Sequence, residues 1–262
     1  MPETPIDLAH AAMEAAPEDD AARLRFYERI ADAELFLLLE AEPEGNDIVP
    51  RIFPVEGERF VLAFDREARL AAFAEGPAPY AALPGRVVAG LLAAEGLGLG
   101  LNLDVAPSAI LLPAEAMGWL AGTLAEGPRE VEGRPEELTP PAGLPERLLA
   151  ALDTKLALAA GLARSAYLVG VRYEGGRRGH MLAFMAAVPG AAEALARATA
   201  EALVFSGLEA GEIDVAFFDL SDPIAARLAR VGLRFDLPEP APVELREVTA
   251  PGMDPAKPPR LR

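Results

Sequence analysis

The sequence predicts an α+β fold built as two compact domains. Short apolar runs typical of strands are mixed with segments of helical period, and 52% of the residues are hydrophobic. A Pro- and Gly-rich stretch separates two such mixtures, and 262 residues suffice for two ordinary domains. We expect a first domain over residues 1–124, a linker over 125–145, a second domain over 146–236 and a Pro-rich tail over 237–262.

Two acidic helices open the first domain. Thr4 or Asp7 can cap the first helix, because both side chains accept hydrogen bonds from free main-chain N–H groups. The apolar residues on this helix are Ile6, Leu8 and Met13. A second helix is expected after the turn at residues 17–20.

Three apolar runs follow, over residues 35–39, 49–55 and 60–64, with turn-forming residues between them. They predict a meander of three strands. Pro50 and Pro54 have no N–H to donate to a β-ladder, so we expect the middle run to be an edge strand.

The rest of the first domain contains both helices and strands. Asp65 can cap a short helix, and Pro84 suits the first position of the next one, which Gly96 ends. Strands at 97–103 and 109–112 and a helix at 113–124 complete the expected elements.

Leucine and glycine alternate along residues 97–103. The period of a strand would place four leucines on one face and Gly98, Gly100 and Asn102 on the other. Since glycine weakens the interior of a strand, we expect a packed element or a ligand close to this face. A pocket there would favour a small-molecule binder or an enzyme, whereas a covered face would favour binding through outer surfaces.

The second domain is predicted as a second α+β layer. Its elements are a helix at 145–162, strands at 167–173 and 181–185 joined by a turn at 174–176, a helix at 189–203, a strand at 213–218 and a final helix. Asp222 is the expected cap of that final helix, with Pro223 in its first turn.

The first half resembles the SseB family, bacterial proteins named for enhanced serine sensitivity. The resemblance is carried by residues 34–39, 60–65 and 98–102 with 110–113, and it covers about residues 20–124. In this family a proline follows the asparagine directly, whereas Leu103 follows Asn102 here. The resemblance implies an α+β module without an established reaction or catalytic residue, and the second half is similar to the SseB C-terminal domain.

Charge and composition exclude several function classes. Residues 1–123 carry 21 acidic and 8 basic side chains, so we expect this half to repel nucleic acid and anionic membrane. The chain has no cysteine, which excludes disulfides, thiolate metal sites and a cysteine nucleophile. No signal peptide or membrane span is expected, which predicts a cytoplasmic protein. Lysine occurs only at Lys155 and Lys257, which we attribute to the codon usage of a GC-rich bacterial genome.

The hairpin of the second domain carries the other candidate site. Arg172, Arg177, Arg178 and His180 could together bind an anion, because guanidinium groups match phosphate and carboxylate. The alternative is a solvated turn whose charges prevent the hairpin from pairing with other strands. His10 lies among alanines in the first helix and has no partner nearby in sequence.

No metal or cofactor site is expected. Asp214, Asp219 and Asp222 are close in sequence, but the strand period separates the first two and helix capping explains the third. The Gly-Leu-Gly-Leu-Gly run leads into a strand, the reverse of a dinucleotide-binding turn.

The aromatic residues Trp119, Phe217 and Phe218 lack the interleaved basic residues of a nucleic-acid surface, so we expect them in the core. Taken together, the sequence favours a non-catalytic protein that binds another protein. The alternative is a binder of a small molecule or anion, or an enzyme, that uses the glycine face or the arginine hairpin.

Overall fold

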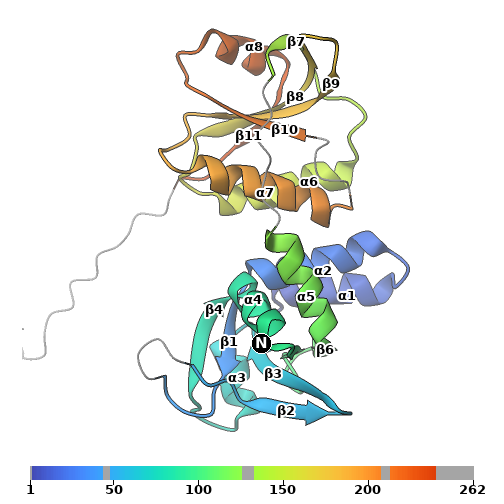
Figure 1. Cartoon of the computed structure of the whole chain (residues 1–262), viewed down its shortest axis with the longest axis vertical. Helices are drawn as coiled ribbons and strands as arrows, with labels where there is room; N and C mark the ends of the chain where they lie inside the picture. Colours follow the sequence, from blue (N-terminus) through green and yellow to red (C-terminus); the bar gives the residue numbers. More distant parts are fainter. Residues whose placement is uncertain (1, 44–47, 126–132, 208–212, 240–262) are drawn as a thin grey trace, which may run out of the picture.

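The computed structural model describes residues 2–43, 48–125, 133–207 and 213–239. Both halves contain helices and strands, and each half has its own sheet, which confirms the α+β fold class. The two halves are stacked along the long axis of the molecule (Figure 1). We call residues 2–125 the N-terminal half and residues 133–239 the C-terminal half; the expected division into two independent domains stays a prediction.

Two helices lead into the N-terminal sheet, α1 (Pro5–Ala15) and α2 (Asp20–Asp32). Thr4 is the cap of α1, as expected: its hydroxyl accepts from Asp7 N at 3.2 Å, and the Asp7 carboxylate accepts from Thr4 N at 2.9 Å. Ile6 is buried, whereas Leu8 is exposed. Leu8 lies two positions from Ile6 and therefore points away from the stripe that meets the core.

The N-terminal sheet has six strands among the described residues: β1 (Glu34–Leu38), β2 (Ile52–Val55), β3 (Glu58–Phe64), β4 (Tyr80–Pro84), β5 (Gly98–Leu101) and β6 (Ile110–Leu112). Their order is β4-β1-β3-β5-β6, and β2 also pairs with β3. The predicted meander is therefore wrong, because β3 and not the middle run is central. The Pro-containing β2 pairs with no other named strand, in agreement with an edge position. Residues 44–47, part of the expected turn before it, lie outside the described residues.

Two helix starts differ from the prediction. Asp65 does not cap α3 (Glu67–Phe73), because its carboxylate binds Arg69 and the Thr4 hydroxyl instead. Pro84 ends β4, a strand that was not predicted, and is the cap of α4 (Gly85–Glu95) and not its first residue. A Cβ on Gly85 would lie 1.8 Å from a main-chain oxygen of α2, so only glycine fits where α4 begins.

The main core of the N-terminal half lies between one face of the sheet and α1, α2, α4 and α5 (Ala114–Ala125). Leu97, Leu99 and Leu101 belong to it, as expected from their alternation. Leu103 does not, because Asn102 has a φ of 51° and turns the chain after β5. Leu103 instead packs in a smaller core on the opposite face, beside α3.

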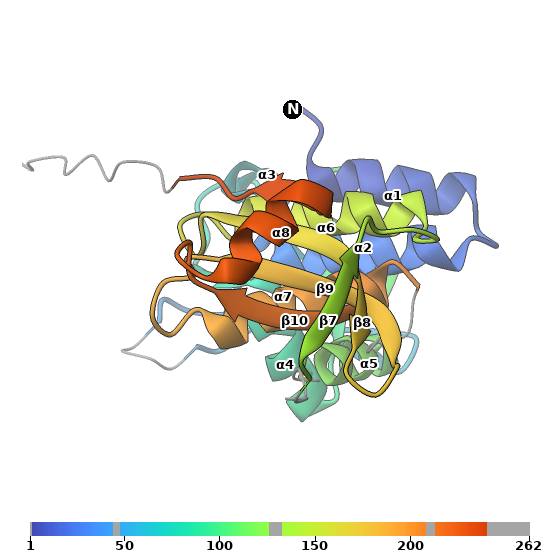
Figure 2. The ribbon, with the colours of Figure 1, turned by 90° about the horizontal axis from the view of Figure 1, so that it is seen from above.

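The C-terminal half has a five-stranded sheet within the described residues. Its elements are β7 (Pro135–Thr139), α6 (Glu146–Leu158), β8 (Ser165–Tyr173), β9 (Arg178–Met185), α7 (Ala192–Phe205), β10 (Ile213–Phe218), α8 (Pro223–Val231) and β11 (Leu233–Asp236). The strand order is β10-β9-β8-β11, with β7 also paired to β8. Helices α6 and α7 cover the face towards the N-terminal half (Figure 1), and α8 covers the other face, in front in Figure 2.

The edges of the second predicted domain are different in the structure. Residues 135–139 of the expected linker form β7, and β11 was not predicted at all. The expected tail begins within the fold, because Leu237 is buried and the Pro238 carbonyl accepts from Gly161 N at 2.9 Å. The remaining parts of the linker and tail predictions, over 126–132 and 240–262, lie outside the described residues.

Candidate functional site

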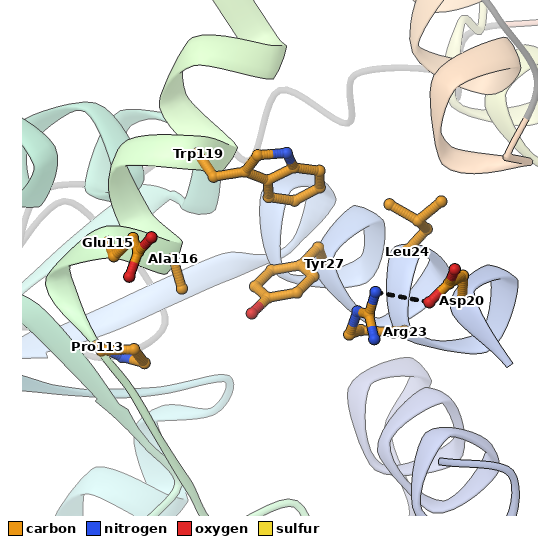
Figure 3. Close-up of a pocket in the computed structure, with 8 residues that line it drawn as sticks. All are labelled: Asp20, Arg23, Leu24, Tyr27, Pro113, Glu115, Ala116 and Trp119. Carbon is orange, nitrogen blue, oxygen red and sulfur yellow. Dashed lines mark hydrogen bonds and ion pairs between the residues drawn. The ribbon is translucent and has the colours of Figure 1, made fainter. Parts of the chain in front are cut away.

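The surface of the N-terminal half is hollowed between α2 and α5. This α2/α5 groove has a volume of about 510 Å³. Its lining comes from one face of each helix and from the residue before α5 (Figure 3): Asp20, Arg23, Leu24 and Tyr27 from α2, and Pro113, Glu115, Ala116 and Trp119 from the α5 side. Both walls are helices anchored in the core, by Phe26 and Ile30 on α2 and by Met117 and Leu120 on α5. The groove is therefore held by rigid elements.

Trp119 forms the upper wall of the groove in Figure 3 and remains 41% exposed. Its ring meets Tyr27 edge to face, with 5.1 Å between ring centroids, and Phe205 of α7 at 6.5 Å. The expectation that Trp119 is a core residue is wrong. It lies two positions from the buried Met117, which places it about 200° around the helix from that residue.

The charges of the groove are acidic on balance. Asp20 and Glu115 contribute two carboxylates, while Arg23 contributes one guanidinium, which binds Asp20 at 2.7 Å. Burial raises the pKa of the Tyr27 hydroxyl, which therefore stays protonated and can donate a hydrogen bond at neutral pH.

A buried ionic cluster joins the two halves next to this groove. We call it the junction cluster, and its members are Glu28 and Asp32 of α2, Arg86 of α4, Lys155 of α6 and Glu201 of α7. The Lys155 side chain is only 3% exposed, and its Nζ lies 2.8 Å from both carboxylate oxygens of Asp32 and 2.9 Å from Glu201. Arg86 donates to both oxygens of Glu201, at 3.0 and 3.2 Å. Two helices of each half thus meet through charged groups.

The junction cluster has three carboxylates for two cations, and the surplus falls on Glu28. Its Oε1 is buried without a hydrogen-bond partner and lies 3.6 Å from Lys155 Nζ. Burial raises the pKa of Glu28, and the attraction of Lys155 offsets this only in part. Burial would also raise the pKa of Glu201, but Lys155 and Arg86 outweigh it, so the pKa of Glu201 is lowered.

The comparison with protein families matches residues 8–119 to the SseB protein N-terminal domain. These residues include α2, the first half of α5 and every residue that lines the groove. The chain carries an SseB N-terminal domain. No curated protein matched the chain, and no solved structure matched it either. The similarity of residues 133–239 to the SseB C-terminal domain stays a prediction.

The glycine face of β5 lies inside the SseB domain and is closely packed, as predicted. A Cβ on Gly98 would lie 2.6 Å from the Phe60 ring and 2.7 Å from a main-chain oxygen of β6. A Cβ on Gly100 would lie 2.5 Å from a Leu62 methyl and 3.1 Å from Leu103. Side chains of neighbouring strands and of the turn after β5, and not a crossing helix, occupy the space that a ligand would need.

Asn102 is fully buried at the end of β5 and belongs to a hydrogen-bonded network of the SseB domain. Its amide oxygen accepts from Asp65 N at 3.1 Å, and its amide nitrogen donates to Ser108 at 2.9 Å. Ser108 in turn donates to Asp7, which is paired with Arg69. Burial alone would raise the pKa of Asp7, but these hydrogen bonds hold it well below its usual range. The network fastens α1 to the sheet.

The arginine hairpin has the predicted turn, with positive φ at Gly175 and Gly176. Arg172 and Arg178 are direct partners across β8 and β9, so they share a face, as the anion-site hypothesis requires. The Nε2 atom of His180, however, already has a hydrogen-bond partner, because it lies 3.0 Å from the carbonyl oxygen of Ala142.

Acidic neighbours occupy two of the three guanidiniums in this hairpin. Arg172 donates to Glu136 at 2.7 Å and to Glu137 at 3.0 Å, both in β7. Arg177 pairs with Asp214 at 3.0 Å and stacks on the Tyr173 ring. An anion would have to compete with these carboxylates, and an anion site here stays a prediction.

The remaining candidates have local roles. Asp222 caps α8 by position, but its side chain accepts from Asp219 N at 2.7 Å. Phe217 is 37% exposed and stacks on Phe184, so its assignment to the core is wrong, whereas Phe218 is partly buried in the core under α8. His10 packs edge to face on Phe26.

The described ranges contain neither a candidate metal site nor a candidate membrane span. No group of three or more His, Asp or Glu side chains there is arranged to hold a metal ion. No helix in the same ranges is long and apolar enough to cross a membrane.

Sequence reasoning missed the groove and the junction cluster. The exposure of Trp119 could have been predicted from the helical period, which places it on a different side of α5 from the buried Met117 and Leu120. The scarcity of lysine is attributed to codon usage, although the place of Lys155 in a helix rich in leucine is a signal. Nothing local shows that Glu28, Asp32 and Glu201 converge on it.

Proposed function

We propose that this protein is a non-catalytic, SseB-like protein-binding module and that the α2/α5 groove is its partner site. The observation that supports this most is Trp119, a half-exposed tryptophan held against Tyr27 in a groove of about 510 Å³. The cytoplasmic location expected from the sequence stays a prediction.

The composition of the groove is typical of the centre of a protein interface. Trp, Tyr and Arg are enriched among the residues that dominate the binding energy of interfaces, and Trp and Tyr bury much area with little loss of conformational freedom. Here Trp119, Tyr27 and Arg23 lie together on two helices, and Leu24 and Ala116 add apolar area. A partner side chain inserted between the helices would displace water from all of them.

The buried titratable groups support a binding role over a catalytic one. Lys155 is surrounded by carboxylates of the junction cluster, and Asp7 is held by Arg69 and Ser108. These groups are held in ion pairs and hydrogen bonds with each other, and none of them lines the groove. They stabilise the surface that binds and leave it rigid.

Affinity capture from an extract of the source cells tests the proposal. The baits are the wild-type chain, Trp119→Ser, the charge reversal Glu115→Arg and the control Phe217→Ser, which alters an aromatic of similar exposure in the C-terminal half. We expect wild type and control to retain the same proteins, and both groove variants to lose at least one of them about tenfold.

Glu115 is exposed, so its variant tests the groove without disturbing the core. The proposal fails if the proteins retained by the two groove variants equal those retained by wild type while circular dichroism shows all four baits folded.

A further inference from the structure

We infer that the α2/α5 groove recognises an arginine side chain of the partner protein. This inference rests on the proposed function and names the chemistry of the group that the groove receives. It is carried by the pairing of an exposed aromatic ring with a carboxylate one helical turn away.

Glu115 and Trp119 stand four residues apart on α5 and therefore project from the same side of the helix. Both line the groove, with Tyr27 facing them from α2 (Figure 3). A guanidinium over an indole face is attracted by the ring electrons, and a neighbouring carboxylate adds a charge-assisted hydrogen bond. Both interactions favour a cation, so they reinforce each other.

The charge of the groove also selects a cation. Its one guanidinium, Arg23, is bound to Asp20, whereas Glu115 has no ion pair with any residue that the structure describes. The 21 acidic and 8 basic side chains of residues 1–123 reinforce this preference. An acidic side chain would meet repulsion from Glu115 and gain nothing from the tryptophan.

Arginine fits these walls better than lysine. Its planar guanidinium stacks on aromatic rings and is less strongly hydrated than an ammonium, so it loses less on leaving water. Pro113, Leu24 and Ala116 give its methylene groups an apolar surface.

Trp119 is the one tryptophan of the 262 residues, so its fluorescence reports on the groove alone. The probe is the peptide acetyl-Ala-Leu-Arg-Leu-Ala-amide, titrated into the full chain at low ionic strength. The control peptide has citrulline, an uncharged isostere, in place of arginine, and a third has lysine. The protein variants are Glu115→Gln and the matched control Glu95→Gln, an exposed glutamate on α4.

We expect saturable binding of the arginine peptide, about fivefold tighter than that of the citrulline peptide and tighter than that of the lysine peptide. Glu115→Gln should weaken it about threefold to tenfold, Glu95→Gln should leave it unchanged, and about 0.5 M salt should weaken it further.

Equal affinity for the arginine and citrulline peptides, an unaffected Glu115→Gln variant, or no fluorescence change up to about 5 mM peptide would each overturn the inference. Such results would leave the capture experiment free to succeed, because a partner could still use the groove through an uncharged side chain. Failure of the peptide titration together with failure of the capture experiment would reject the proposed function itself.

Discussion

Replacing Lys155 by methionine should destabilise the protein more than any other single loss of charge at the junction. Lys155 Nζ contacts three carboxylates, at 2.8 Å for both oxygens of Asp32, 2.9 Å for Glu201 and 3.6 Å for Glu28. Methionine retains most of the volume of lysine, so the change removes the charge and leaves little cavity.

The magnitude follows from the burial of this group. Its side chain is only 3% exposed, so solvent screens the interaction little. Removing one partner of a buried ion pair costs about 3 to 5 kcal/mol, because the remaining charges stay buried without compensation. Arg86 remains to offset three carboxylates, and the expected loss in free energy of unfolding is about 3 kcal/mol or more.

The assay is urea unfolding at pH 7, followed by far-UV circular dichroism and by Trp119 fluorescence. Two probes are needed because the chain has two sheets and a single transition cannot be assumed. The matched control is Arg197→Met on α7, whose exposed pair with Glu193 should contribute less than about 0.5 kcal/mol.

A second variant separates charge from packing. Asp32→Asn combined with Lys155→Met removes one of the uncompensated carboxylates and should recover about half of the loss. A loss below about 1 kcal/mol for Lys155→Met, or a double variant that is no more stable than the single one, would refute this account of the junction.

Three further predictions concern stability. Glu28→Gln should stabilise the protein at pH 7 to 8, because the raised pKa of Glu28 means that the folded state favours the protonated form of this side chain. The gain in stability should disappear as the pH falls and Glu28 becomes protonated in the wild type, and a gain that persists in acid would contradict this explanation. Gly98→Ala should cost more than Gly100→Ala in thermal unfolding, since the new Cβ meets a main-chain oxygen of β6 at 2.7 Å in the first case and a movable leucine methyl at 2.5 Å in the second; equal melting temperatures would count against this packing. Asp7→Asn should lower the free energy of unfolding by about 3 kcal/mol at pH 7. Because the pKa of Asp7 is lowered on folding, the difference between wild type and variant should begin to shrink below the unfolded pKa and vanish only as the pH falls through the folded pKa; a constant difference would show that charge is not the cause.

Much of the local structure could be predicted from short stretches of sequence. The Thr4 and Asp7 caps, the glycine that ends α4 and the turn at Gly175 each depend on residues within a few positions of one another. The leucines of β5 follow from a period of two, which is also a local property.

The short strands β4, β7 and β11 could not be predicted because their sequences favour strands weakly. β4 reads Tyr-Ala-Ala-Leu-Pro and β7 reads Pro-Glu-Glu-Leu-Thr, and both become strands by pairing with β1 and β8. Strand state in such segments depends on the partner more than on intrinsic preference.

The same limit applies to the sites. The basic residues of the hairpin were visible, but not that β7 would place Glu136 and Glu137 against Arg172. The helix at 113–124 was visible, but not that Trp119 would meet Tyr27 of α2 beside a groove.

By itself, the sequence determined the α+β class, the order of most elements, the acidic N-terminal half and the resemblance to the SseB domain. Those properties depend on composition and on spacings of a few residues, which any chain segment carries with it. Only the tertiary structure decided that Lys155 is buried among carboxylates from two other helices, and that the exposed Trp119 meets Tyr27 of α2 beside the Glu115 carboxylate. Contacts between residues far apart in sequence depend on packing, because each buried side chain must fit the space and compensate the charge of the elements that pack around it.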